Sequence, residues 1–418
     1  MSRFQSSPVA PSIETRSSWV TAAAALTVMS VAFGAPYVAV VALKPIAQEL
    51  GGARSVPALS YSLAWLGTAV GGLAMGGIAE RVGIRWTAIF GSLMIGLGLV
   101  LASRGGAITL SVSHGLLIGV LGLGGINAPV YVYISRWFDR HRGTALALIS
   151  SGAYVAGAIW PPLFEYTIGA FGWRDTMLTF AAIEVALVLP TAAFFFHPPP
   201  ESVEAAAGSA TPMHAMPIRG LSPNFVQTLL SAAAFLCCVP MAMPQSHLVA
   251  FCSDLGIAPA QGALMLSVLL GTAFASRQIW GYISDRIGGL RTVLAGSVCQ
   301  ALAIAAMLVT QDEIGLFTVA AFFGFGFSGL IPAYVLTLRE MFPVQEASWR
   351  VPTLMLCSGS GMAFGGWVAG ALYDQFGYYG AAFAAGLVAN IANLVIVGFL
   401  VWRAAPRRPA RILAPGEA

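Results

Sequence analysis

Long apolar runs separated by short polar connections dominate the chain. A helix needs about 20 apolar residues to cross the ~30 Å hydrocarbon core of a bilayer. On that measure the pattern predicts twelve membrane-spanning helices. The predicted spans are Ser18–Leu50, Val56–Ala79, Trp86–Ser103, Ile108–Phe138, Gly143–Gly169, Thr176–Phe196, Pro223–Ser253, Pro259–Ser284, Leu290–Thr310, Ile314–Phe342, Val351–Asp374 and Tyr378–Trp402. Several exceed twenty residues, so we expect them to tilt or to protrude.

Composition excludes a water-soluble fold. The 418 residues are 57% hydrophobic and 9% charged, whereas soluble domains carry about 25% charged residues. Lipid must therefore cover the apolar surface, and we expect an all-α polytopic membrane protein embedded in the bilayer. The net charge of +4 is too small to indicate a nucleic-acid partner.

The cations are distributed unequally between the two sides that the spans define. Of the 21 Lys and Arg residues, sixteen lie on one side, in the connections, at the ends of spans or in the two tails. The other side holds Lys44, Arg54, Arg104 and Arg174, and Arg277 lies within a span. Because cytoplasmic loops carry the excess of Lys and Arg, we expect a multi-pass protein of the cell membrane with both termini in the cytoplasm.

The longest polar stretch lies midway along the chain. Residues 198–222 are rich in Pro, Ala, Gly and Ser, a composition typical of a flexible linker. We therefore predict a cytoplasmic tail at 1–17, a six-helix bundle at 18–197, a cytoplasmic linker at 198–222, a second six-helix bundle at 223–403 and a basic cytoplasmic tail at 404–418.

The two predicted bundles echo each other in sequence. The segment Gly76–Gly83 matches Gly281–Gly288, and Pro129 and Tyr131 match Pro332 and Tyr334 at nearly the same offset. Two independent landmarks at one offset indicate a duplication. Such repeats form pseudo-symmetric bundles that bind substrate between them, near the bilayer midplane.

The repeated segment has the pattern G-x-x-x-[D/E]-R-x-G, whose glycines allow helix ends to approach closely. We expect its acid to pair with an Arg of a neighbouring helix end, Glu80 with Arg136 and Asp285 with Arg339, and so to latch the cytoplasmic side. A solvated loop is the alternative. The predicted cytoplasmic gate comprises Gly76, Glu80, Arg81, Arg136, Gly281, Asp285, Arg286 and Arg339.

Together these features resemble the major facilitator superfamily over nearly the whole chain. A narrower resemblance follows from Arg136–Ala145, which is similar to the segment entering helix five of monocarboxylate transporters and their bacterial relatives. The segments Leu43–Ile46, His247–Val249 and Gly361–Ala363 resemble the bacterial members, and the oxalate/formate antiporter group is related. The resemblance implies a major facilitator fold and transport of a small organic anion.

Arg277 is the one cation deep inside a predicted span of the second half. It lies eight residues before Asp285, about 12 Å along a helix, which places it near mid-membrane. A charge at that depth costs at least ~2.5 kcal/mol, and the positions one turn away, Ala273 and Gly281, carry no acid. We therefore expect an anionic substrate as partner, since guanidinium binds carboxylate through two parallel hydrogen bonds. The alternative is an Arg bonded to carbonyls or to a distant helix.

The resemblance gives the same residue the same role. Monocarboxylate transporters carry a substrate-binding Arg in helix eight, and Arg277 matches it. Mammalian members also carry an Asp one turn earlier for proton coupling, where this chain has Ala273. Oxalate-type antiporters add a Lys in helix eleven, but the predicted span Val351–Asp374 contains no cation. These comparisons favour a monoanion and leave the proton step unassigned.

Other polar groups in the spans are weaker candidates. Asn127, Tyr131, Tyr334 and Tyr37 are predicted to line the substrate site, with interhelical packing as the alternative, while Tyr61 is better explained by packing. Candidates for proton coupling are His247, which titrates near neutrality, and the acids Glu165 and Glu184. The substrate carboxylate itself is a further possible proton carrier.

We therefore predict a secondary transporter of lactate- or pyruvate-like monocarboxylates, coupled to H⁺ and acting as a monomer by alternating access. An organic-anion exchanger or facilitator is the main alternative, and a membrane receptor that binds an anion without moving it is a remote one. An enzyme is not expected, because nucleophile-base sets and phosphate loops are lacking. No cofactor is expected, and no metal, since the five cysteines lie in apolar stretches without metal-binding spacing.

Overall fold

The computed structural model describes residues 12–199, 220–343 and 346–404. Helices make up the secondary structure of these residues, apart from turns and short connections. They are α1 (Arg16–Ala32), α2 (Ala35–Val41), α3 (Leu43–Glu49), α4 (Ser55–Val82), α5 (Ile84–Ala102), α6 (Ala107–Val112), the π-helix η1 (Ser113–Leu123), α7 (Gly124–Ser135), α8 (Arg142–Ser150), α9 (Gly152–Phe171), α10 (Trp173–Phe195), α11 (Pro223–Asp254), α12 (Pro259–Ile287), α13 (Gly289–Val309), α14 (Glu313–Phe327), α15 (Leu330–Met341), α16 (Ala347–Phe376) and α17 (Gly380–Arg403).

Twelve helical stretches in this part of the chain are long and apolar enough to cross a membrane. They correspond one to one with the twelve predicted spans, so the predicted all-α polytopic architecture is confirmed. The first span differs in detail, because it ends at Val41 and a separate helix, α3, follows it.

Proline explains the interruptions of the first and the tenth predicted spans. A proline lacks the N–H that would bond the carbonyl four residues earlier. Accordingly α1 ends at Ala32, four residues before Pro36, and α2 ends at Val41, four residues before Pro45. The tenth span breaks between α14 and α15 in the same way, just ahead of Pro332, whereas the matching Pro129 of the fourth span lies inside α7.

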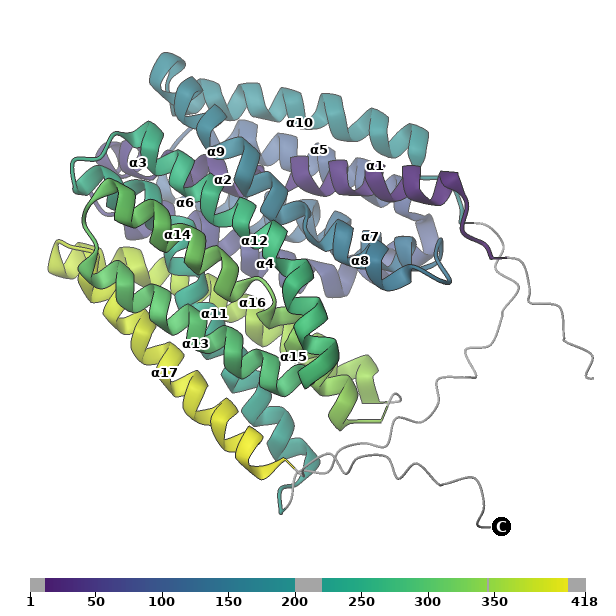
Figure 1. Ribbon diagram of the computed structural model, residues 1–418. Coiled ribbons are helices and arrows are strands. Elements are labelled where there is room, and N and C mark those ends of the chain that lie inside the picture. Colours follow the sequence, from purple (N-terminus) through teal and green to yellow (C-terminus); the bar gives the residue numbers. More distant parts are fainter. Residues whose placement is uncertain (1–11, 200–219, 344–345, 405–418) are drawn as a thin grey trace, which may run out of the picture.

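The helices form two groups that meet along an interface. Figure 1 shows the N-terminal half, α1 to α10, and the C-terminal half, α11 to α17, converging near α3 and α14 and spreading apart toward α8 and α15. Helix α4 packs along α16, and α9 packs along α12. Each half thus contributes its second and its fifth span to the interface, as a pseudo-symmetric pair of bundles requires.

Glycine permits the close approach of α16 to α4. A Cβ on Gly359 would lie 2.9 Å from the Ala69 side chain, and one on Gly370 would lie 2.9 Å from the Ser55 Cα. These contacts run the length of the α4–α16 pairing down to the start of α4. The predicted linker at 198–222 and both predicted tails lie largely outside the described residues.

Candidate functional site

The end of the molecule at which the halves converge is closed by charged contacts between them, and is called the closed end here. Arg54, just before α4, donates from its two terminal nitrogens to Asp254 at the end of α11, at 2.5 and 2.7 Å. Lys44 on α3 donates to the same carboxylate at 3.1 Å. Burial alone would lower the pKa of Arg54, but its hydrogen bonds and charge interactions with Asp254 and Tyr379 together outweigh burial, and the pKa is raised above its ordinary value.

A second acid completes the closed end. Asp374 on α16 accepts hydrogen bonds from the backbone N–H groups of Arg54 at 2.7 Å and Ser55 at 2.9 Å. The Arg54 guanidinium also stacks 3.6 Å from the ring centroid of Tyr373 and donates to the Tyr379 hydroxyl at 3.0 Å. Residues from α3, α4, α11 and α16 therefore join the two halves in one network.

The opposite end, where Arg81, Arg136, Arg286 and Arg339 lie, is called the basic end. Here Glu80 approaches Arg136 at 3.8 Å, with both side chains more than half exposed and both in the N-terminal half. Asp285 and Arg339 form no ion pair among the residues that the structure describes.

The glycines of the predicted gate lie in open surroundings. A Cβ added at Gly76 or Gly281 would meet no atom within 4 Å. Of the two predicted latch pairs, Glu80–Arg136 is therefore present as an exposed contact within one half, whereas Asp285–Arg339 is not formed in this conformation. The role of the latch in another conformation stays a prediction.

Arg277 lies between the halves, on α12. One of its terminal nitrogens donates to the backbone carbonyl of Ser150, at the end of α8 in the opposite half, at 3.2 Å. Its guanidinium carbon lies 5.2 Å from the ring centroid of Tyr154 on α9. Within the described part of the chain this is the hydrogen bond that Arg277 makes, so most of its N–H donors stay available.

Two tyrosines lie near this guanidinium. Tyr131 on α7 and Tyr154 both interact with the charge of Arg277. Tyr37 on α2 is buried against Gly157 of α9 and lies near Tyr61 on α4, with ring centroids 6.4 Å apart. The structure therefore brings Tyr131 near Arg277 and adds Tyr154, which sequence reasoning missed; the predicted contact of Tyr131 with substrate stays a prediction.

Two buried side chains of α4 carry polar atoms without a well-aligned hydrogen-bond partner among the described residues. These atoms are the Tyr61 hydroxyl and the Trp65 indole nitrogen, which are both buried and interact with each other. Their rings lie 6.3 Å apart. Because a buried unpaired polar group is costly, this stretch of the interface suits a ligand with a polar group.

The Tyr334 side chain forms its hydrogen bond inside the C-terminal half. It is fully buried, and its hydroxyl donates to the Asn393 side chain on α17 at 2.7 Å. Asn393 in turn donates to Ser297 on α13 at 2.9 Å. Tyr334 thus belongs to a polar network inside the C-terminal half, and the geometry does not support its predicted contact with substrate. Asn127 lies half-buried on α7, and its role stays a prediction.

The three candidates for proton coupling lie apart. His247 is buried at the closed end, where its Nε2 donates to the Gly366 carbonyl at 2.9 Å and its Nδ1 contacts the Tyr379 hydroxyl at 3.0 Å. Glu184 on α10 is buried and accepts a hydrogen bond from Ser92 on α5 at 3.0 Å. Glu165 is half-buried on α9. None of them contacts Arg277.

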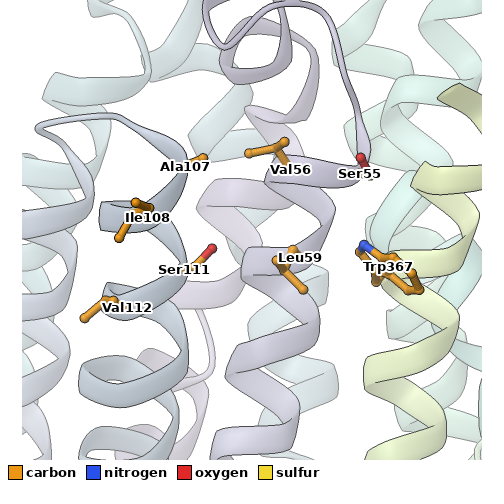
Figure 2. A pocket seen from close by; sticks show the side chains of 8 residues that line it. All are labelled: Ser55, Val56, Leu59, Ala107, Ile108, Ser111, Val112 and Trp367. Carbon is orange, nitrogen blue, oxygen red and sulfur yellow. The ribbon is translucent and has the colours of Figure 1, made fainter.

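A largely open surface cavity of about 300 Å³ lies beside the closed end, between α4, α6 and α16. Figure 2 shows the two serines of its wall, Ser55 and Ser111, among otherwise apolar side chains and the Trp367 ring. This lining offers no cation, so the cavity does not suit a carboxylate. Its walls are formed by Ser55, Val56, Leu59, Ala107, Ile108, Ser111, Val112 and Trp367.

Metal-binding side chains do not gather in the described part of the chain. Residues 12–199, 220–343 and 346–404 contain no cluster of His, Cys, Asp and Glu that could hold a metal ion, and the five cysteines are free thiols.

A two-bundle, twelve-span architecture with an Arg between the halves defines a multi-pass membrane transporter. The sequence model of the Major Facilitator Superfamily matches residues 22–251 and 230–417. The chain therefore belongs to the Major Facilitator Superfamily, and within it the chain is monocarboxylate transporter-like.

Individual relatives agree with this assignment. Monocarboxylate transporter 13 of Rattus norvegicus is 25% identical over 312 residues, which cover 73% of this chain and 71% of the relative. An uncharacterized MFS-type transporter of Bacillus subtilis, YcxA, is 23% identical over 314 residues, covering 71% and 74%.

Solved structures share the fold. A bacterial homologue of the human lysosomal transporter Spinster, crystallised inward-facing and occupied, superposes with a TM-score of 0.68 at 15% identity, covering 92% of this chain and 96% of that one. A peptide transporter in complex with sulfate gives a TM-score of 0.70 at 14% identity, with the same coverage.

Sequence signals existed for some of the residues that were missed. Lys44 and Arg54 are two of only four cations on their side of the predicted topology. An acid facing such rare cations is a reasonable expectation, but their pairing with Asp254 depends on how the two halves meet.

Proposed function

We propose that the chain transports small monocarboxylates such as lactate and pyruvate by alternating access, with H⁺ as the coupled ion. Arg277 carries this proposal. It lies between the halves, commits one nitrogen to the Ser150 carbonyl, and leaves N–H donors that can hold a carboxylate through two parallel bonds. The printed name of the rat relative, a monocarboxylate transporter, supports the same class of substrate.

Tyrosines supply the rest of the proposed site. Tyr131 and Tyr154 interact with the Arg277 charge from the opposite half, and Tyr37 adds an apolar wall with a hydroxyl. A carboxylate bound here touches both halves at once. Binding at such a position allows the two bundles to rock around the substrate, as in transporters with a midplane site.

The orientation is also a proposal. The excess of cations at the basic end supports a cytoplasmic position for that end and for both termini of a cell-membrane protein. The closed end then faces outward, and the network of Arg54, Lys44 and Asp254 seals the outer side. The resulting inward-facing state resembles that named for the Spinster homologue.

Uptake of labelled lactate or pyruvate by proteoliposomes, with an inward acid gradient, tests the proposal. We expect Arg277→Ala to abolish uptake, while Gln278→Ala, an exposed neighbour on the same helix, leaves it unchanged. Unchanged uptake in Arg277→Ala would overturn the role of this residue, and uptake that ignores the acid gradient would overturn symport.

One observation favours exchange or facilitated diffusion as the second candidate. Ala273, one turn before Arg277, is buried where α12 packs tightly on Gly324 of α14. The position thus offers Arg277 neither a carboxylate nor space for one. Counterflow of labelled anion without a proton gradient, combined with no gradient-driven accumulation, would favour this candidate over symport.

A further inference from the structure

Lys44 and Arg54 hold the Asp254 carboxylate as a binding site would hold an anion. The planar guanidinium of Arg54 donates to both carboxylate oxygens, at 2.5 and 2.7 Å. The Lys44 ammonium adds a third contact at 3.1 Å. This fork on a carboxylate is the arrangement by which Arg recognises carboxylates in general.

The two cations belong to one local structure of the N-terminal half. They lie on α3 and just before α4, joined by a tight turn in which Gly51 and Gly52 both adopt φ of 94° and the Gly52 N–H donates to the Ala47 carbonyl at 2.7 Å. Asp254 and Asp374, in contrast, belong to the C-terminal half. Opening of the closed end would therefore separate both cations from both acids.

We propose that Lys44 and Arg54 then bind the carboxylate of the transported anion, and that Asp254 is a tethered competitor for this outer site. The inference rests on the proposed function and orientation. Two cations left beside each other, with Arg54 only 7% exposed in the closed state, favour an anion in place of the lost acid. When the halves close again, Asp254 displaces the substrate carboxylate, which favours its transfer inward.

A simple strut between the halves is the competing explanation, and the two explanations predict different patterns among variants. For a strut, Lys44→Gln and Asp254→Asn both weaken the closed end and shift the KM for external anion in the same direction. For a competitor, the directions are opposite. Lys44→Gln removes a ligand-binding group and raises KM, whereas Asp254→Asn removes the competitor and lowers KM.

The experiment measures uptake of labelled lactate from the face that carries Arg54, in oriented proteoliposomes. We expect Lys44→Gln and Arg54→Lys to raise KM roughly ten-fold, the usual scale of a hydrogen bond to a charged group. Arg54→Lys keeps the charge and loses the fork. We expect Asp254→Asn to lower KM and also to lower kcat, because substrate is no longer displaced.

Arg104→Gln is the matched control, because Arg104 is an exposed cation on the same side of the predicted topology. Its KM should equal that of the wild type. Lys44 is partly exposed, so its substitution is expected to leave folding intact. If KM changes in the same direction for all variants, or does not change in any of them, the proposed outer site is wrong while the proposed transport function stands. Absence of uptake by the wild type would instead overturn the proposed function, and this inference with it.

Discussion

Asp374 caps the helix that begins at Ser55, although the two residues belong to different halves of the molecule. Its carboxylate accepts the Ser55 N–H at 2.9 Å and the preceding Arg54 N–H at 2.7 Å. Such N–H groups have no partner within their own helix, and a carboxylate at this position also complements the helix dipole. The first turn of α4 is thus completed only when the closed end is closed.

Replacing Asp374 is therefore expected to weaken the closed end rather than either half. Loss of a helix cap costs about 0.5–2 kcal/mol, so Asp374→Ala should increase the fraction of molecules open at this end. Spin labels at Arg104→Cys and Gln311→Cys would report the distance between the halves. The control is Asp175→Ala, which removes an exposed acid from the first turn of α10. An identical distance distribution in Asp374→Ala and wild type would contradict the prediction.

The contact between Gly370 and the start of α4 predicts a second effect. A Cβ at this position would lie 2.9 Å from the Ser55 Cα and 3.0 Å from the Arg54 carbonyl oxygen, and these backbone atoms cannot rotate away. Overpacking typically costs about 1–3 kcal/mol, so Gly370→Ala should favour separation of the halves at the closed end.

Gly398→Ala provides the comparison, because a Cβ there would meet no atom within 4 Å. Alanine is the better helix former by about 0.5–1 kcal/mol, so this variant should be as stable as wild type or more stable. Thermal unfolding in detergent measures the stability of both variants. Reaction of a thiol reagent with a cysteine introduced at the closed end measures the separation of the halves. Equal behaviour of the two variants would refute the steric explanation.

The sequence was sufficient for the twelve spans, because the length of an apolar run is a direct consequence of bilayer thickness. It was also sufficient to single out Arg277, since an isolated charge in such a run needs a partner. The direction in which the Tyr334 side chain points could not be predicted from the sequence in this way. Its partner, Asn393, lies 59 residues away in sequence, and only the rotation of two packed helices brings them together.

The charged network at the closed end could not be predicted from the sequence for a different reason. Arg54 and Asp254 lie 200 residues apart, in halves whose relative position would change under the proposed alternating access. Charge tallies place both residues on one side of the membrane, but the choice of partner depends on the conformation. The predicted gate at the basic end and the observed network at the closed end are thus compatible with different states of one protein.

The Tyr334–Asn393 hydrogen bond predicts a loss of stability without a change in substrate binding. Both residues are fully buried, so Tyr334→Phe leaves the Asn393 carbonyl without its donor at a cost of about 1–3 kcal/mol. We expect a lower melting temperature and an unchanged KM. Tyr131→Phe, close to Arg277, should show the reverse pattern. A raised KM in Tyr334→Phe at wild-type stability would return Tyr334 to the substrate site.

Glu184 offers a test of where the coupled proton is carried. Its side chain is fully buried, and one carboxyl oxygen accepts a hydrogen bond from the Ser92 hydroxyl at 3.0 Å, while the other has no partner within the described part of the chain. Both residues lie where α5 packs on α10 inside the N-terminal half. Because Gln keeps the acceptor and has no charge to bury, we expect Glu184→Gln to preserve stability and the dependence of uptake on the acid gradient.

Ser92→Ala is the matched control for this pair, since it removes the donor and keeps the acid. Ser92→Ala should lower stability slightly and leave transport intact, because we expect the Ser92–Glu184 hydrogen bond to contribute only to the packing of α5 on α10. The informative measurement compares gradient-driven uptake with counterflow in the same proteoliposomes. Loss of gradient-driven uptake in Glu184→Gln with counterflow retained would show that this buried acid carries the proton, in spite of its position away from Arg277.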